Sequence, residues 1–321
     1  MRVVQTLSAD RRLDNAHGTA FAMHPADMTF LRSVFLVAAL TSASLAQSEF
    51  KEVPLVSLSD RNISPLGNKA LSIRASEWKH AESAHFVYHF FESFVAAPVS
   101  VEAEFFYSIV AKELGRDTAQ WERKCHVFIF DKQDDWNQFK LSGQLDPWTG
   151  GLCAGGELFL VRDSKLKWKG DTLGHEVTHL IVHRFVGTGV PLWLNEGFAE
   201  YAASRGYASF WRARGYKANP RSQAVNPAQW IPVTTLTSMV SYPGDELQVV
   251  TFYNESERLV RFLSATDKPG FLKFFEAMAQ GNRFDTALNK GFSNKFFNTD
   301  ALEKAFKEYA TKEHGTSMQD K

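Results

Sequence analysis

The sequence predicts an α+β fold, in which a lobe built on a small mixed sheet is followed by a helical C-terminal lobe. Apolar and aromatic runs typical of strands fall in the first half of the chain, at 85–91, 125–130 and 158–161. After residue 171, apolar residues recur mainly at helical spacing. Because the two patterns are segregated along the chain and do not alternate, they favour an α+β class. The 321 residues are enough to bury a sizeable core.

Changes in composition and the positions of Pro and Gly divide the chain into four predicted segments. Residues 1–46 form a dubious leader followed by a signal peptide, and 47–78, which mix Pro, Gly, Ser and short apolar runs, form an N-terminal leader segment. Residues 79–188 form the α+β lobe, and 189–321 form the helical lobe. The sequence contains no internal repeat and no low-complexity tract.

The N-terminal segment predicts export. Residues 1–27 are polar and aperiodic, as in a disordered tail or an extension upstream of the true start codon. Met28–Arg32 then supplies a positive start, Val34–Leu40 an apolar stretch, and Ala46 ends a run of small residues. This order is typical of a secretory signal cleaved after Ala46, so we expect a secreted or periplasmic protein. The alternative is an uncleaved anchor. The uncharged run 33–47 is shorter than the roughly 20 residues that span a bilayer, so no stable membrane insertion of the mature chain is expected.

The charge balance excludes some partners. The whole chain has 36 basic and 36 acidic residues, and removal of the first 46 residues leaves 32 basic and 33 acidic ones. A nearly neutral chain without a basic patch indicates neither nucleic-acid binding nor attraction to an anionic membrane.

Two cysteines, Cys125 and Cys153, are the only ones in the sequence. Export would permit a disulfide between them, whereas two buried thiols are the alternative. The sequence leaves both open, because pairing depends on the distance between their Cα atoms.

The first lobe contains two predicted helices and a hairpin. Residues 102–114 carry apolar side chains at helical spacing and end at Gly115, which suits a helix C-terminus. Residues 134–141 predict a short helix. The paired glycines of 150–156 bracket a loop or hairpin that leads into the last strand.

The second half predicts helices joined by loops. One helix spans 171–185, and another starts near Pro191, which suits a first helical position, and continues to about Ser204. The rest comprises a mostly irregular segment with short helices at 206–250 and helices at 252–263, 270–280 and 299–312.

The helix at 171–185 carries the pattern His-Glu-Val-Thr-His at 175–179. Two histidines four residues apart lie on one face of a helix, where one metal ion can bind both. Glu176 lies on the same turn, close enough to act on a metal-activated water. This is the H-E-x-x-H pattern of zinc metalloproteases, in which the glutamate is the general base.

Glu196 is the predicted third ligand. A catalytic zinc keeps three protein ligands and an open position, and one Zn²⁺ per chain would bind His175, His179 and Glu196. Sixteen residues separate His179 from Glu196, enough for a turn and a return on a second helix. Glu200 lies one turn further and can accept a hydrogen bond from His175. Asn195 is a further candidate for a hydrogen bond among the residues that surround the metal ligands.

His183 is the rival third ligand, and its position argues against it. It lies one more turn along the same straight helix, which cannot easily bring three successive turns to one metal. The H-E-x-x-H-x-x-G-x-x-H class solves this with a glycine and a third histidine. Here Val182 and Phe185 occupy those two places, so we expect His183 to be structural or partly exposed.

The motif helix together with Trp193–Tyr201 resembles the gluzincin metallopeptidases, which include thermolysin and the aminopeptidase N-like enzymes. The closest likeness is to bacterial peptidase MA-like proteins. The resemblance covers residues 80–310 and is specific across 171–201. It implies a zincin-like first lobe, and a downstream tyrosine that stabilises the tetrahedral intermediate. Tyr253 matches that position best and Tyr242 is the runner-up. Simple core packing is the alternative for Tyr253.

Two departures limit what the resemblance implies. The spacing from the second histidine to Glu196 is shorter than in the best-known members, and no Gly-Ala-Met-Glu-Asn stretch is present. The second departure weakens the case for cleavage at an amino terminus.

The sequence therefore predicts a secreted zinc-dependent peptidase that acts on a peptide or protein, with Glu176 as general base and Tyr253 as oxyanion donor. The strand at 158–161 is either a sheet edge that pairs with an extended substrate or an ordinary strand. Two alternatives stay open: a catalytically inactive zinc-site binding protein, and a zinc amidohydrolase that acts on peptidoglycan peptides.

Overall fold

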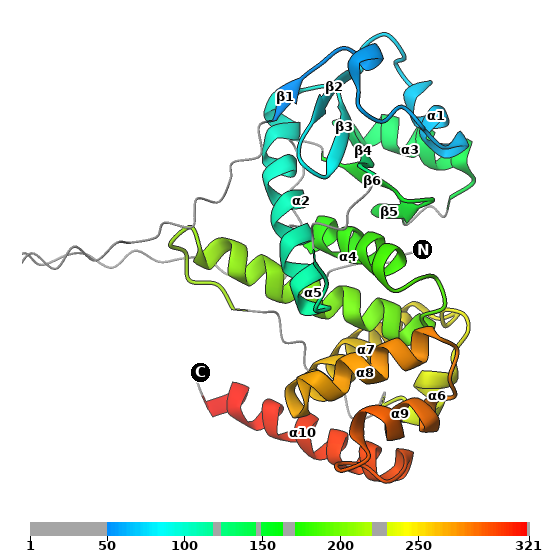
Figure 1. Ribbon diagram of the computed structural model, residues 1–321, viewed down its shortest axis with the longest axis vertical. Helices are drawn as coiled ribbons and strands as arrows, with labels where there is room; N and C mark the ends of the chain where they lie inside the picture. Colours follow the sequence, from blue (N-terminus) through cyan, green and yellow to red (C-terminus); the bar gives the residue numbers. More distant parts are fainter. Residues whose placement is uncertain (1–49, 118–122, 146–148, 163–170, 220–229, 320–321) are drawn as a thin grey trace, which may run out of the picture. The chain divides into compact units, whose positions relative to one another are not determined.

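A computed structural model describes residues 50–319, except 118–122, 146–148, 163–170 and 220–229. Within these residues one six-stranded mixed sheet precedes a helical C-terminal region, which confirms the predicted α+β class (Figure 1). The predicted signal segment, Met28–Ala46, lies outside the described residues.

The sheet has the strand order β1-β2-β3-β4-β6-β5. Its strands are β1 (Lys51–Glu52), β2 (Lys79–Glu82), β3 (Phe86–Phe90), β4 (Cys125–Phe130), β5 (Gly151–Ala154) and β6 (Glu157–Val161). The three central strands, β3, β4 and β6, run parallel, whereas the outer pairs are antiparallel. β3 and β4 are buried along their whole length, because helices cover both faces of the parallel part.

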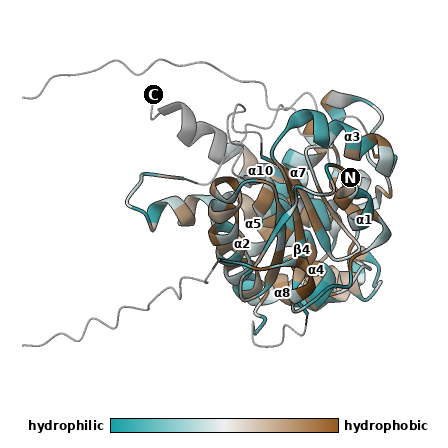
Figure 2. Ribbon diagram, turned by 90° about the horizontal axis from the view of Figure 1, so that it is seen from above, coloured by the Kyte–Doolittle hydropathy of each residue, from teal (hydrophilic) through white to brown (hydrophobic). Residues whose placement is uncertain are grey.

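Alternation along β4 divides its side chains between two apolar clusters. Val127 and Ile129 join the larger core, which also contains buried residues of α2 (Ser93–Glu113) and α4 (Asp171–Phe185). Phe128 and Phe130 join a smaller aromatic cluster on the other face, beside α1 (Pro65–Leu71) and α3 (Gln133–Gly143). Successive side chains of a strand point to opposite faces, so a continuous apolar run serves both clusters. Figure 2 shows β4 as a strongly hydrophobic strand among the helices.

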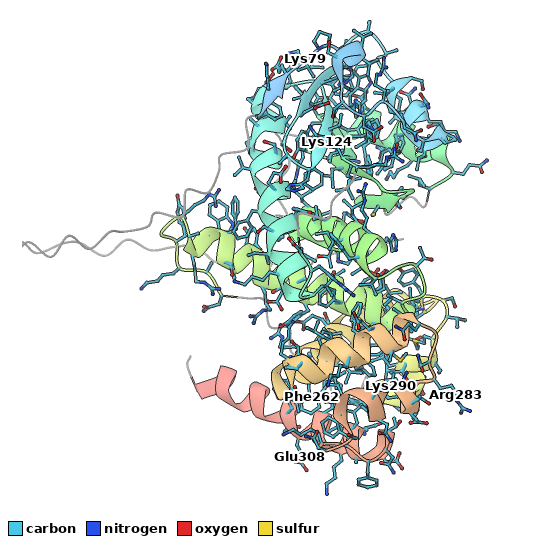
Figure 3. The ribbon with its side chains drawn as sticks, viewed as in Figure 1. Lys79, Lys124, Phe262, Arg283, Lys290 and Glu308 are labelled. Atoms are coloured by element: carbon cyan, nitrogen blue, oxygen red, sulfur yellow. The ribbon has the colours of Figure 1, made fainter. Side chains whose placement is uncertain are left out.

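The helical region follows α4 and shares the larger core with the sheet. Its helices are α5 (Leu192–Arg212), α6 (Val233–Ser238), α7 (Glu246–Thr266), α8 (Lys268–Ala279), α9 (Phe284–Phe292) and α10 (Thr299–Gln319). α5 packs against both α4 and α7. Phe262 of α7, labelled in Figure 3, places its ring 5.8 Å from those of Phe296 and Phe306. The larger core thus runs from the sheet to α10, and the predicted division at residues 188 and 189 stays a prediction.

Several elements are longer than the sequence predicts, or absent from the prediction. α2 starts at Ser93 and not at 102, although it contains Pro98. A proline removes one backbone bond to the residue four positions earlier, here Phe94. Both residues are exposed, so water can satisfy the released carbonyl. A short 3₁₀ turn at Leu55–Ser57, together with β2, α1 and α9, was not predicted, and all of these elements are short.

α2 is the one helix in the described part of the chain that is long and apolar enough to cross a membrane. Its buried face, which includes Phe106 and Val110, contacts β3, α4 and α5. These contacts are those of a helix inside a protein core.

Both cysteines are free thiols, so the disulfide alternative is not formed. Cys125 is buried on β4 and its Sγ donates a hydrogen bond to the carbonyl oxygen of Gly156 at 3.0 Å. Cys153 is half-buried on β5.

Candidate metal centre and active site

The site is built where α4 packs against α5. The spacing of four places His175 and His179 on one face of α4, with their Nε2 atoms 2.9 Å apart. The chain reverses through a turn in which Gly187 has a φ of 109°, a left-handed value that favours glycine. α5 then brings Glu196 back to the histidines: its Oε2 lies 3.3 Å from His175 Nε2 and 3.5 Å from His179 Nε2.

These three atoms fit one tetrahedral metal ion. Ligand bonds of about 2.0–2.1 Å at tetrahedral angles place ligand atoms about 3.3 Å from each other. The ligand atoms of His175, His179 and Glu196 all lie within 4.8 Å of one another, and all three residues are buried. Two imidazole nitrogens and one carboxylate oxygen are also the donor types that zinc prefers.

Electrostatics favours an ionised Glu196. Burial by itself raises the pKa of this carboxyl group, but the attraction of His179 and hydrogen bonds from both histidines outweigh burial. The net result is a pKa well below the usual range of a glutamate. A carboxylate held in its charged form is the form that a metal ligand requires.

Glu200 lies where the sequence analysis expects it. It follows Glu196 by one turn of α5, and its Oε1 lies 3.0 Å from Nδ1 of His175. A proton on Nδ1, facing this carboxylate, would leave Nε2 of His175 with its lone pair toward the other ligands.

Two other polar candidates stand apart from the three ligands. Asn195 Oδ1 is buried and has no hydrogen-bond partner among the described residues, so the structure does not show the predicted bond within the site. His183 is exposed on the last turn of α4, outside the group that can hold a metal.

Glu176 is buried beside the ligands with an unsatisfied oxygen. Its side chain is only 3% exposed, and its Oε1 has no hydrogen-bond partner in the described part of the chain. A buried polar atom without a partner costs free energy, so such an atom in a folded protein calls for a functional or solvent explanation. A water or substrate group in the site would supply the missing partner.

The edge strand β5 lies against this glutamate. A Cβ atom added to Gly151 would lie 3.2 Å from Glu176 Oε1 and 2.8 Å from Thr172 Cγ2, so a larger residue would force these side chains to shift. β6 is hydrogen-bonded on both sides, to β4 and β5. Of the two alternatives for residues 158–161, the structure shows the ordinary strand and not the sheet edge, because the antiparallel hairpin adds β5 outside them.

Both candidate tyrosines lie at the site, in different positions. The Tyr242 hydroxyl donates a hydrogen bond to Glu196 Oε1 at 2.8 Å. The ring of Tyr253 lies 6.4 Å from that of His175 and stacks on Tyr242 at 6.0 Å. Burial, and then the charge of Glu196, raise the pKa of Tyr242 far above that of an exposed tyrosine, so its hydroxyl keeps its proton. The bond from Tyr242 to Glu196 was missed from sequence, where no motif links the two residues.

A buried His–His–Glu set on two packed helices, with an unpaired glutamate beside it, defines a metallopeptidase-like class of site. Residues 110–312 match the Peptidase MA superfamily, and the chain belongs to this superfamily. The matched region includes all of α4, α5 and α7. A comparison with curated proteins found no match. Membership confirms the resemblance found in the sequence and supports a peptidase-like hydrolase with peptide or protein substrates.

Proposed function

We propose that this protein is a zinc-dependent peptidase that hydrolyses peptide bonds at the α4–α5 site. One observation carries the proposal: three buried ligand atoms from His175, His179 and Glu196 lie within 4.8 Å of one another. Buried Glu176, next to His175 in the chain, keeps an unsatisfied oxygen. A structural zinc site is usually closed by four protein ligands, whereas three ligands and a nearby carboxylate suit catalysis.

The chain's own residues would divide the chemistry as follows. Bound zinc would polarise the scissile carbonyl and acidify a water molecule. Glu176 would take the proton from the attacking water and later deliver it to the leaving amine. Tyr253 would donate to the oxyanion as it develops, a role worth roughly 3–4 kcal/mol when a single such donor is removed in other enzymes.

We propose that the substrate backbone pairs with β5. Among the residues that the structure describes, β5 is the terminal strand of the sheet, so one of its sides has no strand partner there. An extended peptide added there would form an extra strand. Gly151 supports this, because its missing side chain keeps that strand close to Glu176.

We also propose that the protein is exported through a signal peptide at Met28–Ala46. The positive start, apolar stretch and small residues before Gln47 support this. N-terminal sequencing of the protein purified from its own host would test it: a mature chain that begins near Gln47 is expected, and one that retains the apolar stretch would refute cleavage.

The catalytic proposal is tested by the substitution Glu176→Gln in the mature chain. The amide keeps the size of the side chain but cannot accept a proton, so zinc content should be unchanged while cleavage of a denatured-protein or peptide library is lost. Activity of the unsubstituted chain should vanish with a chelator and return with zinc. Glu92→Gln, an exposed position at the start of α2, is the matched control and should keep full activity.

Three outcomes would count against the proposal. Retained turnover in Glu176→Gln would remove that residue as the base. A zinc-loaded chain that cleaves no peptide would favour a binding protein without catalysis. Cleavage confined to peptidoglycan peptides would favour the amidohydrolase alternative.

A further inference from the structure

The two oxygens of the Glu196 carboxylate have different partners. Oε2 faces the Nε2 atoms of both histidines, at 3.3 and 3.5 Å. Oε1 accepts the hydrogen bond of Tyr242 at 2.8 Å. The terminal torsion of a glutamate is broad, so the side chain alone does not decide which oxygen faces a metal or whether both do.

We infer that Tyr242 is a positioning residue, which holds Glu196 as a ligand through one oxygen only. The hydroxyl occupies Oε1 and thereby directs Oε2 toward the site. The inference rests on the proposed metal site, and it adds a residue outside the H-E-x-x-H helix and the ligand helix.

Packing fixes the Tyr242 ring in the required place. Tyr242 lies in the segment between α6 and α7 and is half-buried. Its ring meets Phe252 edge-on at 5.9 Å and stacks on Tyr253 at 6.0 Å, with ring planes 22° apart. Two aromatic contacts of this kind restrict the ring more than one would, because each prefers a defined geometry. The hydroxyl is therefore presented to Glu196 by a preformed arrangement.

The same geometry separates the roles of the two tyrosines. A tyrosine hydroxyl has one proton to donate. The proton of Tyr242 is committed to Glu196. A donation from Tyr253 to a substrate oxygen would leave the bond from Tyr242 to Glu196 in place, whereas a donation from Tyr242 would break that bond. The structure thus favours Tyr253 over Tyr242 as the oxyanion donor and gives Tyr242 a different task.

The substitution Tyr242→Phe tests this inference because it removes the hydroxyl and keeps the ring. The probe is zinc alone, measured by competition with a chromophoric chelator. Loss of a hydrogen bond to a metal ligand typically weakens metal binding about 10–100-fold, and we expect a loss in that range. Tyr253→Phe is the matched control, of the same residue type on the same ring stack, and its zinc affinity should stay close to that of the unsubstituted chain while its turnover falls.

A second readout separates positioning from mere loosening of the fold. The visible spectrum of the cobalt(II)-loaded chain reports coordination number, and Tyr242→Phe should shift it toward higher coordination as Glu196 binds through both oxygens. Unchanged zinc affinity together with an unchanged cobalt spectrum would overturn the inference. If Tyr242→Phe weakens zinc binding but the unsubstituted, zinc-loaded chain cleaves no peptide, positioning is supported and the peptidase proposal is refuted. The two failures are therefore distinguishable.

Discussion

Three glutamates near the same histidines have different immediate surroundings. Glu196 lies between two imidazoles, which keep its carboxyl group ionised. Glu200 lies behind His175 on the Nδ1 side, and Glu176 has an oxygen with no described partner. These surroundings suit the proposed roles of Glu196 as ligand, Glu200 as orienting partner and Glu176 as base, since environment sets the charge and reach of each carboxylate.

At the residue scale we predict that Glu200→Gln weakens zinc binding. The amide can still accept a hydrogen bond from His175 but no longer carries the charge that makes the ligand more basic. A loss on the order of tenfold in zinc affinity is expected, toward the low end for such partners. Chelator competition measures it, with Glu92→Gln as the control. Unchanged affinity would reduce Glu200 to a packing role.

At the scale of elements, the site depends on how closely α7 approaches α5. A Cβ atom at Gly197 would lie 2.4 Å from the carbonyl oxygen of Ser256, a backbone atom that cannot move aside easily. Because Gly197 follows Glu196 directly, this contact also determines how the third ligand is presented. The close packing of α7 on α5 therefore explains why the Asn-Glu-Gly stretch has a glycine at position 197.

We predict that Gly197→Ala destabilises the protein by about 1–3 kcal/mol, the usual cost of overpacking. Helix propensity alone would predict the opposite sign, a gain of about 1 kcal/mol, so the direction is decisive. Urea unfolding of the metal-free chain measures the change. Gly244→Ala is the control, since a Cβ atom there meets nothing within 4 Å, and a stabilised Gly197→Ala would contradict the close approach.

At the scale of the whole molecule, a row of buried histidines crosses the sheet. His80 on β2 and His89 on β3 share an Nδ1–Nδ1 contact of 2.8 Å, and His89 Nε2 lies 2.8 Å from Nδ1 of His126 on β4. Burial lowers the pKa of all three; neighbouring imidazoles lower that of His89 further, whereas Asp60 partly opposes the shift at His126. The other charged groups facing His126 are Arg123, which lowers its pKa, and Glu82, which raises it.

The lowered pKa values predict that the folded state loses stability in acid. In the unfolded chain these histidines bind protons at about pH 6.5, whereas in the folded protein they stay neutral to lower pH. Their contribution is therefore fully present above about pH 6.5 and is lost as pH falls below it. Urea midpoints between pH 7.5 and 5.5 measure the trend. His89→Gln keeps a hydrogen-bond donor and an acceptor but does not titrate, so the urea midpoint should fall less steeply with pH. An equally steep fall would refute the attribution of the acid sensitivity to these histidines.

The sequence by itself predicted the candidate ligand set and the class of fold. Spacing alone puts His175 and His179 on one helical face, and the residues before Pro191 are enough for a turn and a return that brings Glu196 within reach. The segregation of strand and helix patterns likewise gave the α+β class. These features are local or periodic, and local geometry leaves a signature in the order of residues.

Tertiary structure decided the rest of the site. Tyr242 meets Glu196 across 46 positions, Gly151 reaches Glu176 from another element, and β5 rather than residues 158–161 forms the edge. Short elements such as β2 and α9 likewise depend on neighbours that pair with them or cover them. These contacts and short elements share one physical reason. A contact between distant segments depends on how whole elements pack, and the packing of an element has no period that a single stretch of sequence can display.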